Sequence, residues 1–199
     1  MSHVESFDTR DRLLQAAANL MWERGFQAAS VDELCQRAEA KKGSFYHFFP
    51  SKTDLAVAAI EMFWAQAKEA FFEPIFKKSG SGLSQLQAMV EKVHEFQLSI
   101  AVEKGSFLGC PFGNLGQEMA RQDERIRKTL QKIFDAHCGY IEAALIRAMQ
   151  AGEIPAGDNR QRAKSIFAIL QGAQLLAKVA NDSKIFRSVI PAIMVIATA

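Results

Sequence analysis

The chain is short of cysteine, of long apolar runs and of metal-ligand spacings, and each shortage argues against a class of protein. Its three cysteines, Cys35, Cys110 and Cys138, are odd in number and irregularly spaced, which argues against a disulfide framework and indicates a reducing cytoplasm. The longest strongly apolar run, residues 189–197, is interrupted by Pro191 and falls short of the about 20 residues that span a membrane. No H-x-x-x-H or C-x-x-C pair occurs, so we expect no metal site and no cofactor.

Net charge is also small, and its local distribution is more informative than its total. The formal net charge is +2, so total charge does not indicate nucleic-acid binding. Residues 40–53, however, contain three lysines and no acid, which gives a local basic segment. The N-terminal sequence MSHVESFDTR carries acids and no apolar core, so we do not expect a signal peptide. With 199 residues, 49% of them hydrophobic, the chain can bury the core of one or two domains.

The basic segment overlaps residues 30–52, SVDELCQRAEAKKGSFYHFFPSK. Their pattern predicts two short helices around a turn and then a third helix. Ser30 and Glu33 form a capping box that predicts the first of these helices. Ser51 and Asp54 give a second capping signal, and we expect Lys52 to be exposed in the first turn that follows. The pattern is typical of a helix-turn-helix that reads DNA, although an ordinary helical hairpin with a basic turn would look similar.

Residues 8–60 resemble the TetR-type transcriptional regulators. The resemblance rests on three segments at fixed spacing: a helix from Thr9 that ends at Gly25-Phe26, then Ser30-Val31-Asp32-Glu33-Leu34, then Lys42-Gly43-Ser44-Phe45-Tyr46-His47-Phe48-Phe49-Pro50-Ser51-Lys52. Two residues depart from the family pattern. Glu39 stands where the turn usually has glycine, which reaches positive φ more easily, and Lys41 stands where a small hydroxyl residue is common.

The resemblance implies a set of DNA contacts. Lys42, Gly43 and Ser44 would open the recognition helix, whose first residues face base edges in the major groove. Other side chains would contact phosphates, which position the protein and give most of the salt dependence. The residues in that set are Arg10, Ser30, Lys41, Tyr46, His47 and Lys52.

The remaining pattern is helical throughout, and it predicts an all-α chain of about nine helices. We expect an N-terminal arm and three-helix DNA-binding head at residues 1–52, with the helix-turn-helix motif at about 30–49. The connecting-helix region should occupy 53–76, with the helical pattern itself ending near Phe72 because Pro74 follows. Residues 77–199 should form an effector-binding and dimerisation domain. Its expected helices span about 83–103, 123–151, 161–180 and 183–197, with a segment at 105–116 that reads as turns around a kinked helix.

The last two expected helices are apolar almost all round, which is typical of a central helix or a subunit interface. In TetR-type regulators, the corresponding helices form a four-helix dimer interface. The resemblance therefore implies a homodimer.

Cys110 lies in Gly109-Cys110-Pro111, where a helix should begin, and a helix N-terminus makes a thiol more reactive. The resemblance includes regulators that sense electrophiles or oxidants through a cysteine in this region, so Cys110 is a candidate sensor, with a small buried core residue as the alternative. An effector cavity lined by aromatic and histidine side chains is a second candidate, with plain core packing as its alternative. Its residues would be Phe96, Phe107, Phe112, His137 and Tyr140.

The sequence therefore predicts a cytoplasmic, sequence-specific DNA-binding regulator, a homodimeric repressor that binds double-stranded operator DNA. A small-molecule or electrophile effector, or modification of a body cysteine, would release it. A small helical enzyme and a protein-binding adaptor are the alternatives. We do not expect an enzyme, because no nucleophile, base and orienting acid are brought together by sequence spacing.

Overall fold

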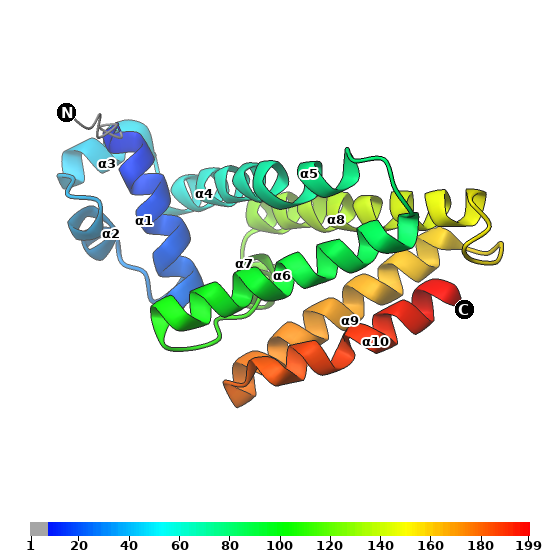
Figure 1. Cartoon of the computed structure of the whole chain (residues 1–199). Helices are drawn as coiled ribbons and strands as arrows, with labels where there is room; N and C mark the ends of the chain where they lie inside the picture. Colours follow the sequence, from blue (N-terminus) through cyan, green and yellow to red (C-terminus); the bar gives the residue numbers. More distant parts are fainter. Residues whose placement is uncertain (1–7) are drawn as a thin grey trace, which may run out of the picture. The chain divides into compact units, whose positions relative to one another are not determined.

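A computed structural model describes residues 8–199, and every regular element in that range is helical (Figure 1). The uninterrupted helical run Lys52–Phe76 contains α4, a π-helical turn and α5; counted as one, it makes nine helices in the described residues, as predicted. The elements are α1 Thr9–Arg24, α2 Val31–Arg37, α3 Lys42–Phe48, α4 Lys52–Ala67, η1 Lys68–Phe72, α5 Glu73–Phe76, α6 Gly82–Lys104, α7 Pro111–Met119, α8 Glu124–Gln150, α9 Asn159–Ala180 and α10 Ser183–Thr198. No helix in residues 8–199 is long and apolar enough to cross a membrane.

By packing, the chain forms two compact units, each built from two separate segments. The first unit contains the described residues up to Ala65 together with Pro111–Leu130, and the second contains Gln66–Cys110 together with Gln131–Ala199. The predicted division into 1–52, 53–76 and 77–199 by sequence order remains a prediction about function. The part of the N-terminal arm at residues 1–7 lies outside the described residues.

In the first unit, α1 packs against α2, α3 and α7. The core contains fully buried apolar side chains from each of α1 to α4: Leu13, Leu20, Leu34, Phe45 and Leu55. Ser30 caps α2, since its Oγ accepts a hydrogen bond from the backbone N–H of Glu33 at 3.1 Å. In the turn after α2, Glu39 has φ 49°, so a glutamate occupies the left-handed conformation that this turn requires.

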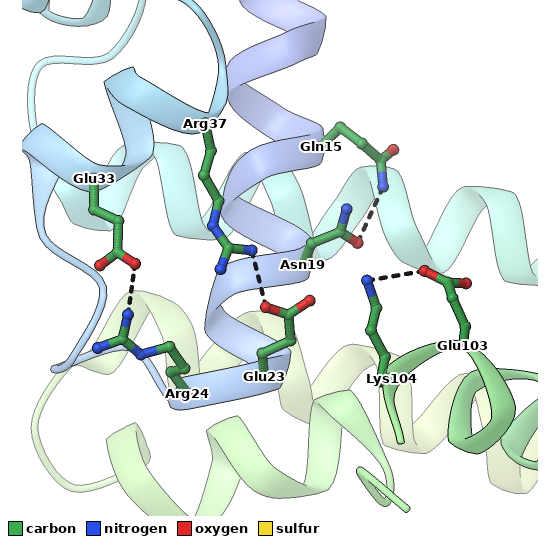
Figure 2. Close-up of polar contacts among 8 residues, drawn as sticks. All are labelled: Gln15, Asn19, Glu23, Arg24, Glu33, Arg37, Glu103 and Lys104. Carbon is green, nitrogen blue, oxygen red and sulfur yellow. Dashed lines mark hydrogen bonds and ion pairs between the residues drawn. The ribbon is translucent and has the colours of Figure 1, made fainter. Parts of the chain in front are cut away.

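Ion pairs between charged side chains also join α1 to α2 (Figure 2). The Arg24 guanidinium lies 2.5 Å from the Glu33 carboxylate, and that of Arg37 lies 2.9 Å from the Glu23 carboxylate. Arg12 Nε donates to the backbone carbonyl of Ala38 at the end of α2, at 2.9 Å. Exposed pairs of this kind each contribute about 1 kcal/mol or less, so the apolar core carries most of the stability.

In the second unit, α9 and α10 pack closely along their lengths, and α10 also packs against α6 (Figure 1). Ser81 caps α6 and donates its hydroxyl to Glu153 Oε2 at 2.7 Å, which anchors the end of the polar segment that precedes α6. The boundaries of α6, α8, α9 and α10 match the expected ranges within two residues.

Two local predictions are wrong. The connecting helix does not end near Phe72, because the wider π-turn η1 is followed directly by α5, whose first turn holds Pro74. Proline is tolerated in a first helical turn, where its missing N–H needs no partner. Residues 105–116 are also not turns around a kinked helix. Gly105 ends α6 in a left-handed conformation, and α7 then starts at Pro111 and continues through both of its glycines.

Candidate nucleic-acid interface

Helix α3 buries one side and leaves a polar side open. Phe45 and Phe49 are buried in the core of the first unit, whereas Tyr46 is 54% exposed. Lys41, Lys42, Gly43 and His47 are also exposed, and Ser44 is half-buried. The residues predicted to contact DNA from this helix therefore share one accessible surface, and their DNA contacts remain predictions.

Nothing within the chain itself requires a glycine at position 43. A Cβ placed on this residue would have no atom within 4 Å, and Gly43 is not among the positive-φ residues of the chain. Neither packing nor backbone conformation within the monomer thus explains its small size. A surface that approaches α3 from outside would explain it.

Lys42 forms an ion pair with the acidic side chain of Asp32. Its ammonium lies 2.6 Å from the Asp32 carboxylate, and this hydrogen bond raises the pKa of Lys42 above its usual value. Both side chains are exposed, so the pair is accessible to a phosphate that would compete with Asp32 for the lysine.

The two candidates that precede the turn between α2 and α3 lie at exposed positions. The Arg10 guanidinium lies 5.7 Å from the centre of the Phe49 ring and 3.8 Å from the Asp11 carboxylate. Ser30 is exposed at the start of α2, where its hydroxyl already accepts the capping bond from Glu33.

Lys52 differs from the expectation that it would be exposed, because it is half-buried against the loop between α1 and α2. Its ammonium donates to the carbonyl oxygens of Phe26 at 2.8 Å and Ala29 at 3.0 Å, and lies 4.2 Å from the centre of the Phe26 ring. Burial lowers the pKa of this lysine. Its predicted phosphate contact remains a prediction, while its contact with the loop is a structural role that the sequence did not indicate.

Sequence reasoning also missed Glu118 on α7. Its carboxylate accepts hydrogen bonds from the backbone N–H groups of Phe26 and Gln27, both at 2.8 Å. No local pattern could have indicated a contact between residues that are more than ninety positions apart.

The predicted effector residues fall into several environments. His137 and Tyr140 both pack against Phe72, with ring centres 4.6 and 4.9 Å apart, and Phe96 packs against Phe71 at 5.0 Å. Phe107 and Cys110 are buried in the same unit. Their effector roles remain predictions.

Phe112 belongs to the first unit, where its ring contacts Phe63 at 5.6 Å and Trp64 at 6.0 Å. It lines a small apolar cleft of about 30 Å³, between α1, α4 and α7. That volume holds no more than a few waters, so the cleft as it stands has no room for a drug-sized ligand.

Cys110 is 8% exposed, and glutamine side chains contact both it and the preceding Gly109. Gln171 Nε2 lies 3.5 Å from its sulfur. Gln97 Nε2 bridges the Gly109 carbonyl oxygen at 3.1 Å and Gln174 Oε1 at 3.0 Å. A polar contact therefore links the segment that carries Cys110 to α9.

Of the other two cysteines, Cys35 is buried and Cys138 is half-buried. Burial raises the pKa of both the Cys35 and the Cys138 thiol, which lowers the fraction of thiolate at neutral pH. All three cysteines are free of disulfides. Residues 8–199 contain no group of three or more His, Cys, Asp or Glu side chains arranged to hold a metal ion.

Comparison with known proteins places both halves of the chain in one group. The family model described as "Bacterial regulatory proteins, tetR family" matches residues 13–59, and the one described as "Tetracyclin repressor-like, C-terminal domain" matches residues 82–193. An uncharacterised HTH-type transcriptional regulator of Lactococcus lactis is 28% identical over 184 residues, which cover 91% of this chain and 89% of that protein. The HTH-type transcriptional repressor NemR of Escherichia coli K12 is 28% identical over 181 residues, which cover 90% and 88%. A crystal structure of reduced E. coli NemR matches with a TM-score of 0.81 at 26% identity, covering 95% of this chain and 97% of that chain.

Proposed function

The chain belongs to the TetR family of bacterial DNA-binding transcriptional regulators, and on that premise we propose that it is a homodimeric repressor released by a change in its body. Members of this family are regulators rather than enzymes, so the helical-enzyme alternative is set aside. The observation that carries most weight is the exposed polar side of α3, which has an open glycine at its start. The similar E. coli protein is named a repressor, and we extend that sign of regulation to this chain.

The proposed interface with operator DNA is the exposed side of α3 together with the start of α2. Lys42, Gly43 and Ser44 would face base edges, and the flanking residues Arg10, Ser30, Lys41, Tyr46 and His47 would meet phosphates. Lys52, which the sequence also placed on a phosphate, would instead support this surface through the loop, because its ammonium already donates to two backbone carbonyls. Two copies of this surface, about 34 Å apart, would read successive major grooves of a pseudo-palindromic site.

Fluorescence anisotropy over a salt series, on the intergenic DNA beside the gene, tests this interface. We expect tight, sequence-selective binding with a steep salt dependence, because lysine and arginine contacts release counterions from DNA. Replacing Lys41 with alanine should reduce the salt slope by about one. Equal affinity for operator and unrelated DNA would contradict the proposal.

A homodimer through α9 and α10 is supported by the apolar side chains that these helices leave exposed. The exposed fractions are 41% for Leu175, 57% for Leu176, 78% for Val179 and 66% for Val195. Val179 lies four positions after Leu175 and three after Leu176, which brings the three side chains to one side of α9. Exposed apolar side chains gathered in this way mark an interaction surface. Because TetR-type regulators dimerise through the corresponding helices, we propose that the partner is a second copy of the chain.

Sedimentation equilibrium tests the dimer. The protein should sediment at twice the mass of its chain, and a double substitution of Leu176 and Val179 by glutamate should convert it to monomer. A surface change elsewhere, Glu61→Gln on α4, serves as the control and should leave the mass unchanged. A wild-type monomer at micromolar concentration would contradict this part of the proposal.

We further propose that Cys110 senses electrophiles or oxidants, with binding of a small molecule in the body as the alternative signal. Its contact with Gln171 supports this role, because an adduct on the sulfur would have to displace α9 side chains. The similar E. coli protein was crystallised in a form described as reduced, which directs attention to thiol chemistry here.

Treatment with N-ethylmaleimide tests the sensor. Alkylation should weaken operator binding in the wild type and in Cys35→Ser and Cys138→Ser, and should have no effect in Cys110→Ser. Release that persists in Cys110→Ser would assign the signal to another group. A repressor of this kind would act in the cytoplasm, where the cysteines stay reduced until a reagent arrives.

A further inference from the structure

Glu118 fixes the loop that connects α1 to α2. Its two carboxylate oxygens each accept a backbone N–H, from Phe26 and from Gln27, at 2.8 Å. Hydrogen bonds to an ionised carboxylate are about twice as strong as those between neutral groups. We propose that Glu118 is a positioning residue for DNA recognition, which makes the placement of α2 and α3 depend on α7.

The loop is shaped to receive this carboxylate. Gly25 has φ 89°, and a Cβ on it would lie 2.8 Å from Glu118 Oε2. A side chain at position 25 would therefore be strained in the backbone and would also push the carboxylate away. The glycine that ends α1 is explained by this close approach.

Backbone carbonyl oxygens of the same loop accept hydrogen bonds from Lys52. While Glu118 takes the N–H groups of Phe26 and Gln27, Lys52 takes the carbonyls of Phe26 and Ala29. The side-chain amide of Gln27 adds a bond to Gln122 Oε1 at 2.8 Å. With donors and acceptors both engaged, the loop has one well-defined conformation.

This loop leads directly into Ser30, the capping residue of α2, so its conformation sets where α2 begins. Helix α3 follows α2 after a short turn and packs against both α1 and α2. A shift of the loop by a fraction of an ångström therefore moves the surface that carries Lys42 and Gly43. Recognition of base edges requires placement of this accuracy.

Helix α7 also offers a route for regulation, and this step rests on the proposed sensor role of Cys110. The helix starts at Pro111, the residue bonded to Cys110, and Glu118 lies in its last turn. A nine-residue α-helix moves as a rigid element, so a displacement at Pro111 is passed on to the carboxylate. Modification of Cys110 would then loosen the loop and lower operator affinity.

Glu118→Gln is the decisive variant, because the amide keeps the size of the side chain but offers one acceptor and no charge. We expect about tenfold weaker operator binding with an unchanged salt slope, since Glu118 contacts no phosphate. Glu124→Gln is the matched control: it removes one negative charge from the same unit, but its ion pairs reach only Arg127 and Lys128 on its own helix. The control should bind within about twofold of wild type.

A merely structural role is separated from positioning by the response to alkylation. If Glu118 only stabilised the fold, unmodified and alkylated protein would lose affinity by the same factor. Positioning instead predicts that the ratio of the two affinities falls toward one in Glu118→Gln. Binding of Glu118→Gln as tight as that of the control would overturn the proposal. Where alkylation weakens wild-type binding, an unchanged ratio in Glu118→Gln would overturn it too.

Hydrogen exchange gives a readout that does not depend on DNA. The amides of Phe26 and Gln27 should be protected in wild type and should exchange at least tenfold faster in Glu118→Gln, with faster exchange also in α2. Unchanged exchange would overturn the proposal, whether or not an operator is found. Loss of DNA binding by wild type would instead contradict the proposed function, and wild-type binding that ignores alkylation would contradict the sensor alone.

Discussion

The Lys52 ammonium lies 2.8 Å from the carbonyl oxygen of Phe26 and 4.2 Å from the centre of the same residue's ring. A lysine in the first turn of a helix opposes the helix dipole, so its presence there needs a compensating interaction. The sequence suggested a DNA phosphate. In the structure, the compensation comes from the backbone of the α1–α2 loop.

Lys52→Met should therefore lower the free energy of unfolding by about 1–2 kcal/mol, because it leaves two carbonyl oxygens without a charged donor. Operator binding should weaken while its salt slope stays the same. Lys41→Met is the control, since Lys41 is exposed and makes no capping bond: its slope should fall by about one and its stability should not change. If the salt slope of operator binding falls in Lys52→Met, the phosphate contact that the sequence predicted would be supported instead.

Gly43→Ala should raise stability and weaken DNA binding at the same time. Alanine is favoured over glycine in a helix by about 0.5–1 kcal/mol, and the added Cβ meets no atom of the protein. On an operator it would occupy space that the proposed DNA contact needs. Gly139→Ala in α8, where a Cβ is equally unobstructed, should stabilise by a similar amount and leave affinity unchanged. Thermal melts and anisotropy check both, and undiminished affinity in Gly43→Ala would remove Gly43 from the interface.

Asp32→Asn should tighten operator binding at low salt. Asp32 pairs with Lys42 at 2.6 Å, so the free protein must give up this contact before Lys42 can bind a phosphate or a base. The gain should be several-fold at low ionic strength and should vanish as salt is added, because both groups are exposed. Glu61→Gln, an exposed acid of α4, is the comparison and should change affinity much less. An equal effect of the two would mean that only total charge matters.

The stability of the protein should fall as the pH drops from about 6.5 toward 4, through His137. Burial lowers the pKa of His137 from 6.5 to about 4, so below pH 6.5 the unfolded chain binds a proton that the folded chain excludes. The full difference amounts to about 3 kcal/mol at pH 4, from 1.36 kcal/mol per pKa unit. Urea denaturation at several pH values measures it.

His137→Phe should remove this part of the pH dependence, because phenylalanine does not titrate and can still pack against Phe72 and Phe167. His47→Gln, at an exposed position in α3, should retain it. If the two variants show the same pH dependence, another group is responsible.

Features set by neighbouring residues could be predicted from the sequence. Ser30 accepts the bond from Glu33, and Ser51 accepts one from the backbone N–H of Asp54 at 3.1 Å, as both capping signals predicted. The departure at Glu39 leaves the left-handed turn in place, since Glu39 itself takes a φ of 49° where the family usually has glycine. The boundaries of α6, α8, α9 and α10 were predictable because apolar residues repeat with the helical period.

Features that depend on residues far apart in the sequence could not be predicted from it. Glu118 contacts loop residues that lie 91 and 92 positions away in the sequence. Neither segment carries a pattern that indicates a contact with the other. Phe112 was grouped with body aromatics because it lies between them in the sequence, yet it packs in the first unit against Phe63 and Trp64. Periodicity indicates which side of a helix is buried, but it does not indicate which helix covers it.

The first unit combines a segment that ends at Ala65 with another that begins at Pro111, and this has a practical consequence for the design of biosensors. Hybrid regulators are made by joining the reading head of one protein to the ligand-binding body of another. A hybrid joined near residue 77 would keep Phe26 and Gln27 but would take its α7 from the donor of the body. Such a hybrid should transplant residues 111–130 along with the head, or else select a body that carries a carboxylate at the position of Glu118.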